Sequence, residues 1–205
     1  MEIMIERMSE VQVVDIRRQM LPAAEAAVRI VQEIPEARLD DPTPCPDWDV
    51  RDVVNHLILW NARGGTAARK LPTTGPGEDH DFTAEAHWAD RFAEQARETA
   101  RAWTDPAAWE GSTSLTGNKA GMPAEFIAGI VFGECVVHGW DLAVATGREP
   151  GFTPEVVQAA WEQLVTTAEV SRKYGAFGAE VPVPQDAPLL DRVLGLSGRD
   201  PYWTP

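Results

Sequence analysis

The chain has 205 residues, of which 44% are apolar and 24% charged, so it is long enough to enclose a full hydrophobic core. Its 32 acidic side chains outnumber the 18 basic ones and give a formal net charge of −14. Because contacts to phosphate need clustered cations, this balance excludes an extended nucleic-acid surface and disfavours binding to anionic membranes.

The chain also lacks the usual signs of export. Its first ten residues alternate charged and apolar side chains, and no stretch approaches eighteen uninterrupted apolar residues. Cys45 and Cys135 are too few for a disulfide framework in a chain of this size. We therefore expect a cytoplasmic protein with reduced cysteines, no membrane partner and no nucleic-acid partner.

The first two predicted helices are amphipathic, with apolar residues at every third or fourth position. The first covers residues 9–34, and Pro22 within it predicts a kink or a break. The second begins at Asp49, whose carboxylate can accept hydrogen bonds from free N–H groups, and Asp52 sits near the positive end of the helix dipole. The pair Gly64-Gly65 predicts the end of this helix.

Three longer helical segments and one short one follow. A third helix is predicted at about residues 83–103, and residues 104–122 read as irregular. A strongly apolar fourth helix runs over about 123–146, with proline in its first turn and glycine just beyond its end. Further helices are predicted at 154–173 and at 188–196.

This order of elements predicts an all-α protein. Four main helices, each with one apolar face, pack most simply as a four-helix bundle, which we assign to residues 1–150. Residues 151–205 form a short C-terminal helical extension packed on that bundle. Bundle cores also bring inward-facing side chains from different helices together, and such side chains often hold a metal ion.

A candidate metal site follows from three residues. Glu134 and His138 are four apart, so they lie on one face of the fourth helix, one turn from each other. His56 lies in the second helix among apolar neighbours. Two imidazoles and one carboxylate suit Zn²⁺, Ni²⁺ or Fe²⁺, and three protein ligands leave one position open, as in catalytic zinc sites.

The alternative is that these polar residues are hydrogen-bonded members of the core. The spacing of Glu134 and His138 is a weak signal when taken alone. However, burying three polar groups on two helices costs free energy unless each finds a partner. One shared cation explains all three, so we favour a metal site.

The sequence resembles the mycothiol-dependent maleylpyruvate isomerase-like family, which belongs to the DinB-like superfamily of metal-binding four-helix bundles. Three segments carry the resemblance: residues 43–57, with the sequence TPCPDWDVRDVVNHL; residues 134–147, which contain ECVVHGWDLA and a final Thr-Gly; and residues 177–201. The last of these is similar to an uncharacterised, mainly actinobacterial branch. Together they span nearly the whole chain.

The resemblance implies a divalent metal, usually zinc, bound by His56, Glu134 and His138. It also implies mycothiol as a cosubstrate whose sulfur occupies the open metal position. A metal ion deprotonates a coordinating thiol, and the thiolate is the nucleophile. The isomerase itself has a larger C-terminal domain than the roughly fifty residues that follow Gly151 here, so the resemblance does not extend to maleylpyruvate as the substrate.

Five further residues have weaker roles in this interpretation. Asp141 lies three positions past His138 and could either orient its imidazole or anchor the end of the helix. Arg63 lies two turns from His56, about 10.5 Å along the same face, and could receive a substrate carboxylate or simply remain solvated. His80 and His87 are possible fourth ligands, but we expect both at the surface, and we expect Cys135 in the core.

Our first hypothesis is therefore a zinc-type, thiol-using transferase or isomerase that acts on a small electrophile with a low-molecular-weight thiol. The second is a metal-binding stress-response protein without turnover. The third is a bundle that forms a homodimer and in which the polar triad is only structural. Metal analysis separates the third hypothesis from the others, and thiol-dependent turnover separates the first from the second.

Overall fold

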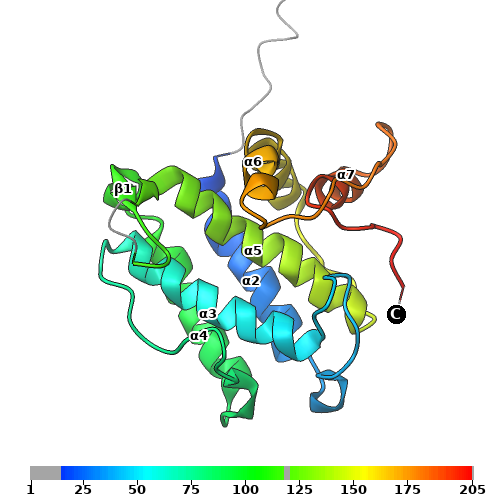
Figure 1. Ribbon diagram of the computed structural model, residues 1–205, viewed down its shortest axis with the longest axis horizontal. Coiled ribbons are helices and arrows are strands. Elements are labelled where there is room, and N and C mark those ends of the chain that lie inside the picture. Colours follow the sequence, from blue (N-terminus) through cyan, green and yellow to red (C-terminus); the bar gives the residue numbers. More distant parts are fainter. Residues whose placement is uncertain (1–14, 118–120, 205) are drawn as a thin grey trace, which may run out of the picture.

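Four helices pack side by side in the computed structural model, which describes residues 15–117 and 121–204 (Figure 1). They are α2 (Ile16–Gln32), α3 (Val50–Ala68), α4 (Trp88–Ala102) and α5 (Ala124–Ala145). Helices α2 and α3 each contact both α4 and α5. This arrangement confirms the predicted all-α four-helix bundle.

The C-terminal part adds two helices to one side of the bundle (Figure 1). Helix α6 (Pro154–Lys173) packs on α2 and α5, and α7 (Leu189–Leu196) packs on α6. The start of α6 is stabilised by Thr153, whose hydroxyl accepts a hydrogen bond from the N–H of Val156. The predicted helical extension is therefore present, while its boundary at residue 150 stays a prediction.

The connections contain short regular pieces that periodicity did not predict. Three 3-10 turns, η1 (Glu36–Arg38), η2 (Phe82–Ala84) and η3 (Pro106–Trp109), lie between the helices. Strands β1 (Ser112–Thr113) and β2 (Met122–Pro123) pair antiparallel, with Ser112 opposite Pro123 and Thr113 opposite Met122. Two-residue strands are too short to show an alternating pattern in the sequence.

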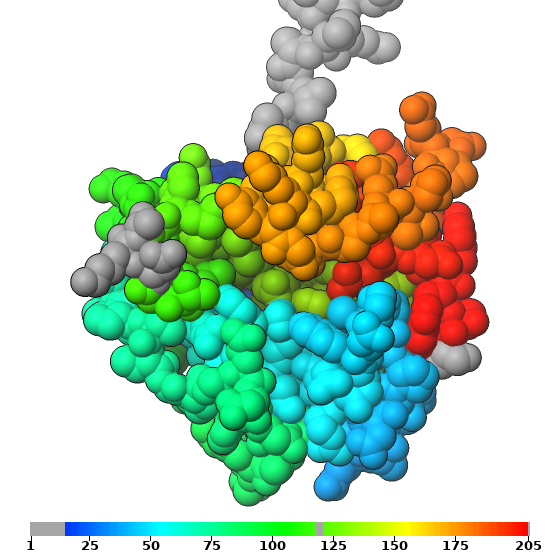
Figure 2. Space-filling view, in the orientation of Figure 1, coloured from blue at the N-terminus to red at the C-terminus, as the bar shows by residue number. Residues whose placement is uncertain are grey.

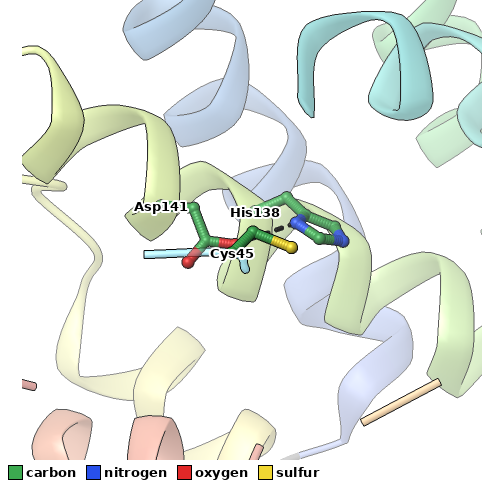
Figure 3. A group of neighbouring side chains, drawn as sticks. All are labelled: Cys45, His138 and Asp141. Atoms are coloured by element: carbon green, nitrogen blue, oxygen red, sulfur yellow. Dashed lines mark hydrogen bonds and ion pairs between the residues drawn. The ribbon is translucent and has the colours of Figure 1, made fainter. Parts of the chain in front are cut away.

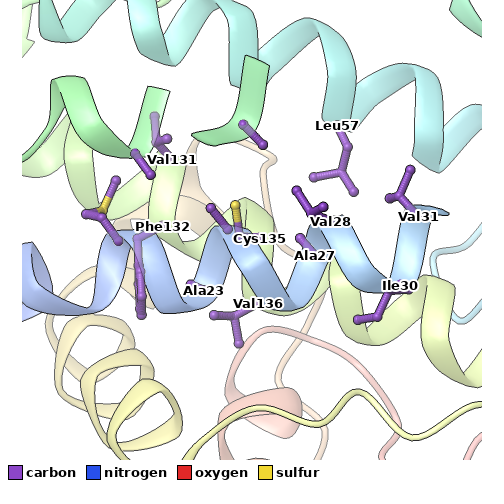
Figure 4. Close-up of a cluster of buried hydrophobic side chains, with 14 of the residues drawn as sticks. Ala23, Ala27, Val28, Ile30, Val31, Leu57, Val131, Phe132, Cys135 and Val136 are labelled. Atoms are coloured by element: carbon purple, nitrogen blue, oxygen red, sulfur yellow. The ribbon is translucent and has the colours of Figure 1, made fainter. Parts of the chain in front are cut away.

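The apolar core lies between α5 and the three other bundle helices. Figure 4 shows side chains of α2, α3 and α5 meeting there, among them Val28, Leu57 and Phe132. Helix α5 is long and apolar enough to cross a membrane, with a mean hydropathy of 1.5 in its most apolar window, but 78% of that window is buried inside the protein. Burial against α2, α3 and α6 explains why this helix is apolar on nearly every side.

Helix α2 continues through Pro22 without a break, in contrast to one of the two outcomes predicted there. Proline has no N–H to bond the carbonyl four residues earlier, which disfavours a helix interior. Buried neighbours on both sides, Met20 and Ala23, are 3% and 0% exposed, and their packing holds the helix together. The predicted start at residues 9–14 lies outside the described residues.

The predicted end of the second helix at Gly64-Gly65 is wrong, because α3 continues to Ala68. Both glycines are buried where α3 meets its neighbours. A Cβ at Gly64 would lie 2.7 and 3.0 Å from the two methyl groups of Val131 on α5, and one at Gly65 would lie 2.6 Å from the hydroxyl of Thr99. The glycines therefore permit close helix packing instead of terminating the helix.

The predicted start of α3 is confirmed by a reciprocal pair of hydrogen bonds. Asp49 accepts from the N–H of Asp52 at 2.9 Å, and the Asp52 carboxylate accepts from the N–H of Asp49 at 3.2 Å. This capping box satisfies N–H groups that have no partner within the helix.

Replacing Asp49 with alanine should therefore lower the free energy of unfolding by about 1 kcal/mol, because a helix N–H loses its partner. Urea denaturation followed by circular dichroism measures this change. Asp49→Ser is the control, since serine is an equally good cap and should remain within a few tenths of a kcal/mol of wild type. Equal losses in both variants would contradict the capping role.

Candidate metal centre

His56 of α3 and the pair Glu134 and His138 of α5 bring their polar atoms together between the two helices. The Nε2 atom of His56 lies 2.8 Å from Glu134 Oε2, and the Nε2 atom of His138 lies 3.6 Å from the same oxygen. One ligand atom from each of the three residues lies within 4.8 Å of the other two. The structure thus brings together all three residues that the sequence suggested as ligands.

The helices themselves produce this convergence. Glu134 and His138 are one turn apart on α5, so both side chains leave the helix on the same face. His56 faces them because α3 packs along α5. The apolar neighbours Val53, Val54 and Leu57 are each fully buried and fix the rotation of α3 about its axis.

Burial and neighbouring charges shift the pKa of the Glu134 carboxyl in opposite directions. The side chains of His56, Glu134 and His138 are 20%, 21% and 10% exposed, so the group is mostly shielded but still reachable from solvent. Burial tends to raise the pKa of the Glu134 carboxyl, but the charge of His138 and the hydrogen bond from His56 outweigh it, and the pKa lies below its ordinary value. Glu134 is therefore anionic at neutral pH and suited to a cation.

Asp141 lies behind His138, one turn further along α5, and is fully buried. Its carboxylate accepts a hydrogen bond from His138 Nδ1 at 2.9 Å (Figure 3). With its proton on Nδ1, the His138 imidazole keeps a lone pair on Nε2, the atom that faces Glu134. A carboxylate in this position is a common partner of metal-binding histidines.

Two tryptophan rings lie against the histidines, Trp48 from the loop before α3 and Trp60 from α3 itself. The ring centroid of Trp48 lies 4.7 Å from that of His56 and 5.8 Å from that of His138. Trp60, one turn beyond His56 on α3, lies 5.8 Å from its ring. Both rings are only partly exposed, so they form part of the apolar surroundings of the two histidines.

The proline-rich loop before α3 places Trp48. The Thr43 hydroxyl donates to the carbonyl of Trp48 at 2.8 Å and accepts from the N–H of Cys45 at 3.1 Å. Asp47 adopts a positive φ of 66°, a conformation that aspartate tolerates better than most residues. The loop is thereby folded back so that Trp48 lies against both histidines.

A second group of donors, Cys45, His138 and Asp141, also lies within 4.8 Å, and Figure 3 shows its members. The Arg199 guanidinium lies 3.3 Å from Cys45 Sγ and 3.0 Å from Asp141 Oδ2, so a cation would be repelled there. Burial also raises the pKa of the Cys45 thiol to about 11, which keeps it protonated. The first group is therefore the better candidate for a metal site.

Arg63 lies near the group but already has partners. Its guanidinium lies 4.7 Å from the Trp60 ring and 3.3 Å from a carboxylate oxygen of Glu78, whose side chain is 69% exposed. The side chain of Arg63 is itself only 14% exposed, so it is not a freely solvated residue. Its predicted role in substrate binding stays a prediction.

The other polar residues near the predicted site point elsewhere. His80 pairs with Glu85 at 2.7 Å, and His87 is exposed before α4, so neither belongs to the group of donors. Asn55 accepts hydrogen bonds from the backbone of η2. Cys135 is buried in the core as expected, and burial raises the pKa of its thiol to about 12.

The residues present fit a divalent metal ion. Two neutral imidazole nitrogens and one anionic carboxylate oxygen form a donor set of the kind found in zinc sites with three protein ligands. A buried acceptor already orients one of the imidazoles. Figure 2 shows α5, in yellow-green, at the floor of a hollow between α3, in cyan, and the C-terminal segment, in orange and red.

The fold and this group of donors define a four-helix bundle with a three-donor candidate metal centre between two of its helices. The model of the mycothiol maleylpyruvate isomerase N-terminal domain family matches residues 20–143, more than half of the chain, and the chain belongs to that family. The matched region contains His56, Glu134, His138 and Asp141. It ends before α6, so it does not include Arg199.

Two similar proteins carry the name uncharacterised protein. Two proteins of Mycobacterium tuberculosis, one from strain CDC 1551 / Oshkosh and one from strain ATCC 25618 / H37Rv, are each 26% identical to this chain over 179 residues. The alignment covers 86% of this chain and 93% of either relative. An alignment of this length extends beyond the bundle and includes α6. No solved structure matches the chain.

Proposed function

We propose that this protein is a metal-dependent, thiol-using enzyme, a transferase or an isomerase that acts on a small electrophile in the cytoplasm. His56, Glu134 and His138 hold one divalent ion, with zinc the preferred metal and nickel or iron compatible with the same donors. The observation that carries the proposal is the convergence of these three donors from α3 and α5. The family match supports mycothiol as the thiol.

Each residue has a defined task in this proposal. When bound, the divalent ion supplies a Lewis acid that favours the thiolate form of a thiol at neutral pH. Glu134 provides the anionic donor, and Asp141 keeps the His138 proton on Nδ1. Trp48 and Trp60 limit the access of water to the histidines.

Arg63 is the proposed contact for an anionic group of the electrophile. Its guanidinium carbon lies over the Trp60 ring, and its exposed partner Glu78 can be displaced by a substrate carboxylate. In an isomerase the sulfur–carbon bond that forms with the electrophile later breaks and returns the thiol. In a transferase the sulfur stays on the product, and the leaving group takes the electron pair of the broken bond.

Cobalt substitution tests the proposal. We expect the metal-free protein to take up about one Co²⁺ per chain, with histidine nitrogens at about 2.0–2.1 Å from the metal by X-ray absorption. Adding a low-molecular-weight thiol should then produce a sulfur-to-cobalt charge-transfer band in the near ultraviolet, because the thiolate occupies the open position.

Variants identify the residues responsible. His56→Ala and His138→Ala should lose the bound cobalt, and Glu134→Gln should retain it less well because the only anionic ligand is removed. His80→Ala and His87→Ala are matched controls that should bind cobalt like wild type, since neither side chain belongs to the group. Cobalt uptake without a thiol band would favour a metal-binding protein without thiol chemistry, and no uptake would favour a structural bundle.

A further inference from the structure

Arg199 is a buried cation that belongs to no part of the proposed metal-binding set. It follows α7 in the C-terminal tail and is only 6% exposed. Its Nε atom lies 3.2 and 3.3 Å from the two oxygens of Asp141, and its Nη2 atom lies 3.0 Å from Asp141 Oδ2. Because Asp141 is 0% exposed, this is an ion pair with almost no access to solvent.

The ion pair lies directly behind the candidate metal centre. Asp141 Oδ2, the oxygen that contacts Arg199 Nη2, also accepts the hydrogen bond from His138 Nδ1. Burial disfavours the charged form of Arg199, but Asp141 and, more weakly, Glu134 hold its pKa above the ordinary value. The charge of Arg199 thus interacts with a proposed ligand as well as with its direct partner.

Among the residues that the structure describes, the other groups in contact with Arg199 add no charge. Cys45 Sγ, from the loop before α3, is a protonated thiol, and the remaining contact is the backbone carbonyl of Ser197 at 3.4 Å. From α3, His56 contributes a neutral imidazole when it acts as a metal ligand. The charges that matter are therefore those of Glu134, Asp141 and Arg199.

These charges determine which ligands suit the open position. Two carboxylates and one guanidinium give the site one negative charge overall, so a divalent ion leaves it with one positive charge. Binding an anion then makes the whole site neutral. Without Arg199 the metal-bound site would already be neutral, and an anion would leave excess negative charge in a mostly shielded place, which costs free energy.

We propose that Arg199 is a charge-balancing residue that makes a metal ion held by His56, Glu134 and His138 favour an anionic ligand over a neutral one. This inference rests on the proposed metal centre and deepens it. It gives the C-terminal extension a task at the site, because Arg199 of that segment is the cation paired with Asp141. A thiolate is an anion, so the same charge balance favours the thiol chemistry proposed above.

The test measures azide binding to cobalt-loaded full-length protein by its visible absorption at constant pH and ionic strength. Arg199→Gln should weaken azide binding about tenfold, because one positive charge is lost near the metal. It should still retain cobalt, since removing a cation does not reduce the attraction for Co²⁺. Arg192→Gln is the control and should bind azide like wild type, because Arg192, on α7, lies over the ring of Trp161 on α6.

A double variant without either charge tests whether the effect of Arg199 on azide binding comes from its charge or from its role in the fold. In the double variant Asp141→Asn/Arg199→Gln both charges are absent, so the site again has one positive charge with cobalt bound. We expect its azide affinity to return to within about threefold of wild type, and Asp141→Asn alone to bind azide at least as tightly as wild type. A merely structural role predicts instead that the double variant is as impaired as the worse single variant.

Melting of the metal-free proteins gives a second readout. Arg199→Gln leaves the Asp141 charge buried without its cation and should have the lowest melting temperature, while the double variant should recover most of the loss. Cobalt-loaded Arg199→Gln with unchanged azide affinity, or a double variant with no recovery, would overturn this inference and leave the metal centre standing. Wild-type protein that takes up no cobalt would refute the metal centre and this inference with it.

Discussion

Replacing Gly64 with alanine is expected to destabilise the fold, whereas the same replacement at Gly133 is expected to stabilise it. At Gly64 the new Cβ would lie 2.7 and 3.0 Å from both methyl groups of the buried Val131, so no rotation of that side chain relieves the clash. Overpacking of this kind typically costs about 1–3 kcal/mol, while alanine gains about 1 kcal/mol over glycine as a helix former. The net loss should be up to about 2 kcal/mol.

Gly133 is the matched control because it is also inside a helix but has open space around it. No atom lies within 4 Å of a Cβ built there. Gly133→Ala should therefore raise the free energy of unfolding by up to about 1 kcal/mol. Urea denaturation of the metal-free proteins measures both changes, and a shift of the same sign in both variants would contradict this account.

A second substitution, at Val131, tests whether the Gly64→Ala variant is destabilised by a clash with that side chain. Val131→Ala removes the two methyl groups that Gly64→Ala would meet, so the double variant should be less destabilised than the sum of the two single ones. Strict additivity would mean that the two side chains do not clash. This contact matters for the site, because it sets the approach of α3, which carries His56, to α5, which carries Glu134 and His138.

The helices were predictable where the sequence has strong local signals. The apolar periodicity of α6 and the proline at its start predicted both of its ends, Pro154 and Lys173. Asp49 and Asp52 predicted the first turn of α3 through a mechanism that involves only neighbouring residues. The same local reasoning failed at Gly64, because the reason for that glycine lies on another helix.

In the candidate site too, residues whose position follows from local spacing were predictable, and those placed by contacts between distant segments were not. Helical spacing alone places Glu134 and His138 on one face of α5, and a facing His56 requires only that α3 pack against it. Trp48 could not be assigned to the site from spacing, because a loop with a left-handed Asp47 places it there. Arg199 lies 58 positions from Asp141, and no periodic pattern connects the C-terminal tail with α5.

Removing the metal is expected to lower the melting temperature of the protein by about 10 °C without loss of its helices. A ligand that binds only the folded state stabilises it by about 3–4 kcal/mol at a free concentration a few hundred times its Kd. In this protein the ion would bridge α3 and α5, and binding would require both helices in their native positions. The stabilisation by the metal should therefore depend on the complete native bundle.

The helical signal should survive chelation because the bundle has an apolar core independent of the three ligands. Side chains such as Leu57, Phe92 and Phe132 are at most 1% exposed, pack in the apolar core and are not metal-ligand candidates. Thermal melts followed by circular dichroism, with zinc and then with a chelator, measure both quantities. His138→Ala is the control, since its melting temperature should not respond to either addition. Complete unfolding on chelation would show that the ion is structural, and an unchanged melting temperature in wild type would show that these residues bind no metal.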